Sequence, residues 1–177
     1  RLWATYLGGS GNEQPNSLIV DEQSNLYMVG RSNSVNYPVL NNGTVAGTDF
    51  DIIVSKLNST GSVLMGSRKI GGSGMDGVNI ATARILNSLQ RNYGDDGRSE
   101  LILDNSGNVV LVSQSQSGGN GSGAGKFPVT PGAFQTSFGG GVQDAVIVKL
   151  SSDLNNILFS SFLGGSGNDG GYAIAVN

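Results

Sequence analysis

Carboxylates are the residues of this chain with the clearest capacity for chemistry. Asp76 and Asp169 lie in glycine-rich segments, and Asp95, Asp96 and Glu100 lie close together between them. Two carboxylates that flank a glycosidic bond can act as acid and as nucleophile or base, so a propeller-type lyase or a glycosidase is one interpretation. The alternative is a solvated acidic loop. It is favoured because the chain has no His and no Cys, which removes the commonest general base and the thiolate nucleophile. We therefore expect no catalytic residue and no enzyme.

Two glycine patterns match the dinucleotide-binding fingerprint G-x-G-x-x-G, at 72–77 and at 165–170. That fingerprint binds pyrophosphate only where a helix follows the glycines. After the second copy, residues 172–176 predict a strand instead. We therefore interpret both patterns as a repeated turn in which Gly supplies positive φ, and we expect no cofactor.

The run 104–108, Asp-Asn-Ser-Gly-Asn, resembles the start of a calcium loop, and Asp21 occupies a similar place. Calcium takes six or more oxygen ligands, usually including a bidentate carboxylate. Here only five residues separate two predicted strands, and no acidic residue follows in the next turn. An Asx-stabilised turn is the favoured interpretation, with a bound cation as the alternative, and we expect no metal site.

Aromatic side chains could stack on sugar rings, which would make the chain a carbohydrate-binding adhesin. Most of them fall at equivalent places in a repeat, as Trp3 and Phe159 do, so packing is the favoured interpretation. The aromatic residues considered are Trp3, Tyr6, Tyr27, Phe50, Phe127, Phe134, Phe138, Phe159 and Phe162.

One glycine-rich segment occurs three times and organises the chain, at 6–12, 70–76 and 163–169. Such self-similarity indicates a repeat architecture. Runs of β-branched and aromatic residues predict short antiparallel strands. The predicted strands cover 2–7, 17–21, 26–30, 51–57, 63–70 and their equivalents in the second repeat. Between Gly71 and Gly164 the second repeat carries an extra 20 residues before its first strand and ten more between its second and third strands.

The predicted fold class is all-β, with two complete four-stranded antiparallel repeats and a flanking strand at each end. Residues 1–7 form the last strand of a preceding repeat, and residues 8–70 form the first repeat. Residues 71–163 form the second repeat, with insertions near 81–100 and 114–126, and residues 164–177 begin a third. Apolar residues at 81, 85, 86 and 89 predict one short helix over 81–91.

Composition excludes several partners. The formal net charge is −3 and the sequence pI is about 4.7, so the chain offers no basic surface for nucleic acid or anionic lipid. No apolar run is long enough to cross a bilayer, so we expect no membrane insertion. With 37% hydrophobic residues the chain can still bury a core.

The order of motifs resembles a known family. T/S-x-L-G-G-S-G-x-D is followed by I-x-V-D-x-x-G-N-x-x-V, by F-P-V-T-P-G-A-F-Q and by D-A-V-I-V-K-L. This order is similar to that of the SBBP repeats, which build seven-bladed β-propellers. The likeness is closest over 127–150 and 159–176.

The resemblance implies that each repeat is one blade of a β-propeller, so that this chain is a propeller fragment. Blades with open edges need other protein segments to complete the ring, and these are the expected partners, with a glycan as a further possibility. Similar proteins are secreted to the bacterial cell surface, some through type IX secretion. The resemblance thus implies a repeat module of an exported bacterial surface protein that acts in structure, adhesion or protein interaction.

Overall fold

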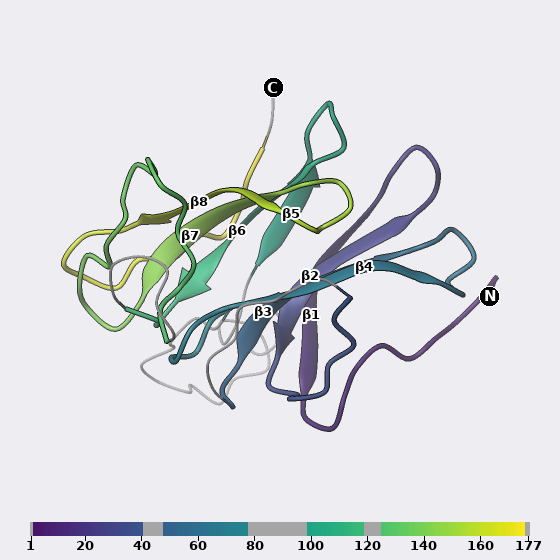
Figure 1. Cartoon of the computed structure of the whole chain (residues 1–177), viewed down its shortest axis with the longest axis horizontal. Helices are drawn as coiled ribbons and strands as arrows, with labels where there is room; N and C mark the ends of the chain where they lie inside the picture. The colour runs from purple at the N-terminus through teal and green to yellow at the C-terminus, as the bar shows by residue number, and fades with distance from the viewer. Residues whose placement is uncertain (1, 41–47, 78–98, 119–124, 176–177) are drawn as a thin grey trace, which may run out of the picture.

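Eight strands make up the regular structure of the described residues, which are 2–40, 48–77, 99–118 and 125–175 of a computed structural model (Figure 1). They form two four-stranded antiparallel sheets, each with its strands in chain order. The first sheet contains β1 (Glu13–Val20), β2 (Leu26–Ser32), β3 (Asp51–Leu57) and β4 (Leu64–Ile70). The second contains β5 (Glu100–Leu103), β6 (Val109–Ser115), β7 (Asp144–Leu150) and β8 (Ile157–Leu163). The predicted all-β class is confirmed. No helix occurs in these ranges, and the helix expected over 81–91 lies outside them.

An aspartate closes the hairpin between the first two strands of each sheet. Asp21 Oδ1 accepts hydrogen bonds from the backbone N–H groups of Gln23 (3.0 Å) and Asn25 (2.8 Å). Asp104 makes the equivalent pair of bonds within its own turn. These are Asx turns, as the sequence predicts, and they fix the register of β1 with β2 and of β5 with β6.

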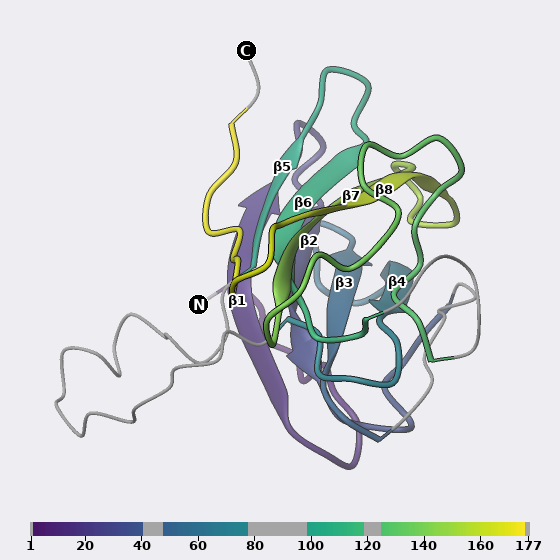
Figure 2. The same ribbon diagram turned by 90° about the vertical axis from the view of Figure 1, so that its left-hand side faces the viewer.

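The core lies between the two sheets, which are adjacent in both views (Figures 1 and 2). β5 lies beside β1 and β2. Strands β2 and β3 of the first sheet contribute Tyr27, Val29, Ile52 and Val54 to the core. The second sheet contributes side chains from all four strands, with Phe162 of β8 among the largest that are fully buried.

The two sheets contribute opposite faces to this core. Leu18 and Leu101 are separated by the same 83 residues as Asp21 and Asp104, so they hold the same place in the repeat. Leu101 is fully buried between the sheets, whereas Leu18 is 63% exposed. Conversely, Ile70 is fully buried, whereas Leu163, at the equivalent place in the second repeat, is 55% exposed. The sheets therefore pack head to tail, and each keeps one face that no other sheet of the described chain covers.

The two flanking strands predicted at the ends of the chain are wrong. Residues 2–7 and 172–175 have no regular secondary structure. β4 and β8, which hold the equivalent place in the two repeats, each pair with the strand that precedes them, whereas no described strand pairs with residues 2–7. Tyr6 is fully exposed, whereas Trp3 packs its ring against Gly61 and donates its indole N–H to the carbonyl of Ser59 (3.0 Å). Residues 172–174 lie against the second sheet but pair with no strand among the described residues.

Candidate functional site

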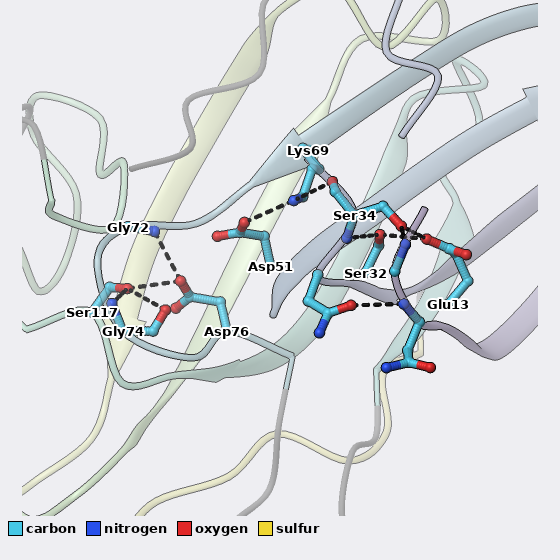
Figure 3. A network of polar contacts seen from close by, with 12 residues as sticks. Glu13, Ser32, Ser34, Asp51, Lys69, Gly72, Gly74, Asp76 and Ser117 are labelled. Atoms are coloured by element: carbon cyan, nitrogen blue, oxygen red, sulfur yellow. Dashed lines mark hydrogen bonds and ion pairs between the residues drawn. The ribbon is translucent and has the colours of Figure 1, made fainter. Parts of the chain in front are cut away.

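A carboxylate buried in the second glycine-rich turn is the centre of the main polar network (Figure 3). Asp76 Oδ2 accepts hydrogen bonds from the backbone N–H of Gly72 (2.8 Å) and from Ser117 Oγ (2.7 Å). The same serine oxygen accepts the N–H of Gly74 at 3.0 Å. The turn is therefore held in shape by one carboxylate and one hydroxyl that reach it from the loop after β6.

The first repeat builds the same arrangement from different residues. Glu13 takes the place of Asp76 and accepts hydrogen bonds from Ser34 Oγ and from Ser32 Oγ, the latter at 2.8 Å. Ser34 also accepts the N–H of Gly11 at 2.7 Å. Desolvation raises the pKa of Glu13, but the two hydroxyl donors, the backbone N–H of Gly9 and the Lys69 ammonium together bring it below its ordinary value. The recurrence shows that a turn acid with a Ser-x-Ser loop is part of the repeat.

The turn around Asp76 also connects the two sheets. The backbone N–H of Asp76 donates to the carbonyl of Phe50 (2.6 Å), next to β3 of the first sheet. The next N–H, of Gly77, donates to the carbonyl of Gln114 (2.8 Å) in β6 of the second sheet. Gly77 has φ 74°, a conformation that favours glycine. The expected positive φ is thus found at Gly77 alone, because no other glycine of the two patterns at 72–77 and 165–170 has positive φ.

A second buried carboxylate meets this turn from the first sheet. Asp51, at the start of β3, pairs with Lys69 of β4 at 3.1 Å between Oδ2 and Nζ. Lys69 Nζ also donates to the carbonyl of Ser34 at 3.1 Å. A Cβ atom on Gly71 would collide with Asp51 Oδ1 and would lie 2.7 Å from Asp76 Oδ2. The two carboxylates therefore flank the backbone of Gly71.

We refer to Asp51, Lys69, Gly71, Gly72, Asp76 and Ser117 as the joint. Burial raises the pKa of Asp51 to about 6, although the Lys69 ammonium opposes that shift. Burial also raises the pKa of Asp76 to about 7, against the hydrogen bonds of Ser115, Ser117 and Gly72, and the charge of Asp51 adds to the rise. The joint is thus a pair of buried acids with one lysine, which contacts Asp51.

The counterpart of the joint in the second repeat has lost its lysine. Asp144 holds the place of Asp51, and Phe162 holds the place of Lys69. Asp144 is fully buried and accepts the N–H of Gly139 at 2.5 Å through Oδ2. Its Oδ1 is buried without a hydrogen-bond partner among the described residues, and burial raises the pKa of this carboxyl. Asp169, the turn acid that follows, accepts the N–H of Gly165 at 2.8 Å.

The carboxylates proposed for catalysis do not form one exposed pair among the described residues. Asp76 is fully buried, Glu100 lies in β5 opposite Val112, and Asp95 and Asp96 lie outside the described ranges. Asp51 and Lys69 were missed in the sequence interpretation. The recurrence of the Ser-x-Ser pattern at 32–34 and 115–117 is a signal that could have indicated the network.

The candidate calcium residues are satisfied by donors from the protein. Lys149 Nζ lies 2.6 Å from Asp104 Oδ2, and together with the hydrogen bonds of Asn108 it holds the pKa of Asp104 well below its usual range. Asp21 has a weaker contact with Lys56, at 3.9 Å. A lysine therefore stands where a cation would approach each turn. In the ranges described, no group of three or more potential ligands could hold a metal ion.

The aromatic candidates divide into buried and exposed sets. Tyr27, Phe127 and Phe162 are fully buried, which confirms packing for these three. Phe134 is 84% exposed, and Tyr6 is fully exposed. Tyr27 also carries the Lys56 ammonium over its ring, 4.7 Å from the ring centroid.

Substitution of the equivalent glycines Gly72 and Gly165 tests whether Ser117 packs against the second glycine-rich turn. A Cβ on Gly72 would lie 2.6 Å from Ser117 Cβ, whereas a Cβ on Gly165 would meet nothing within 4 Å. We expect Gly72→Ala to lower the free energy of unfolding by about 1–3 kcal/mol, the usual cost of overpacking. Gly165→Ala should be neutral or slightly stabilising. Urea denaturation of both variants measures this, and equal effects would contradict the packing of Ser117 against the turn.

Comparison with models of known families gives a match. A family model described as SBBP, beta-propeller repeat, matches residues 2–38. This segment contains the first glycine-rich turn, β1 and β2. No curated protein matches the chain. Within the described ranges there is no helix of the length and apolarity that a membrane span requires.

Proposed function

Because residues 2–38 match the SBBP β-propeller repeat, we propose that this chain supplies two blades of a β-propeller in an exported bacterial surface protein. Its role is non-catalytic, as a structural or adhesive module that contacts other protein segments. Each of the two sheets is one blade, and the turn acids Glu13, Asp76 and Asp169 mark where successive blades are joined.

The head-to-tail packing of the two sheets is the observation that supports this proposal. The face of the first sheet that carries Leu18 is equivalent to the face of the second that carries Leu101, and only the latter is buried. When one face of a repeat packs on the opposite face of the next repeat, the same interface can form between every successive pair. The repeats then close into a ring if the rotation from each repeat to the next permits it. Rings of this kind are propellers, in which closure protects each blade.

The burial of the acids supports a structural role for them. A substrate has to contact a catalytic carboxylate, and Asp76 is sealed from solvent by its own turn and by Ser117. Its hydrogen bonds go to groups that shape the turn, and its backbone N–H bonds the start of β3. These contacts favour a structural role for Asp76, in which it holds two blades together, over a catalytic role in a propeller lyase or glycosidase.

Hydroxyl-radical labelling tests the ring. Leu18 and Met28 are paired on the uncovered face of the first sheet, and Met75 is 40% exposed in the turn. In the polypeptide purified from its natural source we expect Leu18 and Met28 to be oxidised several-fold more slowly than in the 177-residue chain. Met75 serves as the reference, with equal rates in both samples. Equal rates at all three residues would contradict a further blade on this face. The intact mass of the native polypeptide, measured in parallel, shows how much chain accompanies the two blades.

A further inference from the structure

The joint contains more buried acid than buried base. Asp51 and Asp76 flank Gly71, and Lys69 contacts Asp51 at 3.1 Å. Asp76 receives only neutral donors, the N–H of Gly72 and the hydroxyls of Ser117 and Ser115. Its Oδ1 is buried with no hydrogen-bond partner in the described part of the chain. A second buried negative charge without a cation is costly, and binding of a proton removes that cost.

We propose that Asp51 and Asp76 form a proton-operated latch between the two sheets, closed while the pair retains a proton and opened when both carboxyls are ionised. This inference rests on the proposed function, since it assigns a means of regulation to the contact between successive blades. On opening, Asp76 leaves its buried position, both carboxylates become hydrated, and the retained proton passes to solvent.

The position of Asp76 explains why ionisation would act on the contact between the sheets. Its side chain holds Gly72 and Ser117, and the N–H groups of Asp76 and Gly77 bond one sheet each, through Phe50 and Gln114. When the side chain of Asp76 moves into water, the turn must also break the two backbone hydrogen bonds that Asp76 and Gly77 donate to the sheets. The turn is therefore the smallest unit that can open without disruption of either sheet.

The described charged groups around the latch lie on or beside the strands of the first sheet. Lys69 of β4 is the cation in contact with Asp51, and it is also attracted by Glu13 of β1. Asp49, just before β3, adds negative charge near Asp51. Arg31 of β2 packs beside Gly77, with its guanidinium over the ring of Phe50 at 4.7 Å and its Nε bonded to Gln14. The added negative charge of Asp49 favours retention of the proton, in keeping with the raised pKa of both latch residues.

Site-resolved amide exchange of the 177-residue chain between pH 5 and pH 8 tests the latch. The reporters are the N–H groups of Gly72 and Gly77, and the reference is the β6–β7 ladder. After correction for intrinsic exchange, we expect the opening constant at the reporters to rise by at least about tenfold across this range, because opening releases a proton. The opening constants of the ladder amides should not rise over the same pH range. A parallel rise of ladder and reporters would overturn a local latch in favour of global unfolding.

Two variants complete the test. In Asp76→Asn, which keeps an acceptor but cannot ionise, the rise of the opening constant with pH should become several-fold smaller, because only Asp51 can still release a proton on opening. Asp169→Asn, at the same place in the turn of the third repeat, should leave the wild-type response intact. An unchanged pH response in Asp76→Asn would overturn the proposal.

Carboxyl carbon NMR of the wild-type chain tests the latch even if Asp76→Asn does not fold. A titration midpoint of Asp76 above about 5.5 is expected, and a midpoint near the ordinary value of about 4 would overturn the proposal. None of these measurements depends on a ring. The two proposals can therefore fail separately. Equal labelling of Leu18 in both samples would contradict the ring alone, and the absence of pH-dependent exchange at the reporters would contradict the latch alone.

Discussion

Phe162→Ala should lower the free energy of unfolding of this chain by about 3–5 kcal/mol, the usual cost of the loss of a fully buried aromatic ring. Phe162 is fully buried, and its ring centroid lies 5.7 Å from that of Phe127 and 5.9 Å from that of Phe138. The substitution would leave a cavity at the point where β8, the loop before β7 and the core meet. Equilibrium urea denaturation measures the loss as a fall in the transition midpoint with little change in its slope.

Tyr6→Ala is the matched control, because Tyr6 precedes its Gly-Gly pair by two residues, as Phe162 does. Tyr6 is fully exposed, so its removal should change the free energy of unfolding by less than about 0.5 kcal/mol. A large loss from Tyr6→Ala would mean that residues 2–7 pack as a strand after all. A small loss from Phe162→Ala would mean that the core between the sheets is wrongly placed.

Lys69→Met should produce a second large loss, and one that depends on pH. The substitution leaves Asp51 buried without its ammonium partner, which lies 3.1 Å away in the wild type. Removal of one member of a buried ion pair typically costs about 3–5 kcal/mol when the remaining group stays charged. We expect a loss of that order at pH 8, measured by urea denaturation.

The loss should be smaller at pH 5. Burial raises the folded-state pKa of Asp51 above its unfolded value of 3.8, to about 6 with Lys69 present, and removal of the ammonium raises it further. A raised folded-state pKa means that the acid contributes its full stability below its unfolded pKa and loses it as pH rises through the folded one. At pH 5 Asp51 of the variant is protonated and needs no partner. Equal losses at pH 5 and pH 8 would contradict this account.

Lys149→Met is the control for Lys69→Met. Lys149 also pairs with an aspartate, at 2.6 Å from Asp104, but its side chain is 36% exposed. Water solvates Asp104 when the lysine is removed, so we expect only a small change in stability at either pH. A loss comparable with that of Lys69→Met would show that the exposed ion pair of the aspartate turn stabilises the chain as much as the buried pair of the joint.

The sequence was sufficient to predict the strands that pair with a neighbouring strand along the chain. β2, β3 and their hairpin neighbours follow from apolar runs separated by Asx and glycine turns, and each pairs with the next strand along the chain. Residues 2–7 have the same apolar pattern as β8, yet they form no strand. A pattern specifies which residues suit a strand, but it does not supply the neighbour whose N–H and C=O groups the strand requires.

The joint was beyond sequence reasoning for a different reason. Asp51 and Asp76 lie on opposite sides of β4 in the sequence, and their approach depends on how one sheet stacks on the next. Lys69 and Phe162 occupy the same repeat position with unrelated chemistry, so repetition alone predicts neither residue. By contrast, the Ser-x-Ser loops recur with their acids and can be recognised once their role is known.

The opposite faces of the two sheets have a consequence for how such a protein can grow during evolution. A tandem duplication of one repeat copies both faces at once, and the Leu101-type face of the new repeat already fits the Ile70-type face of the old one. No second mutation is needed to create a complementary surface, as it would be for an interface between identical faces. Afterwards each contact can diverge separately, as the exchange of Lys69 for Phe162 illustrates. The number of repeats is then limited by gene length rather than by the need for new surfaces.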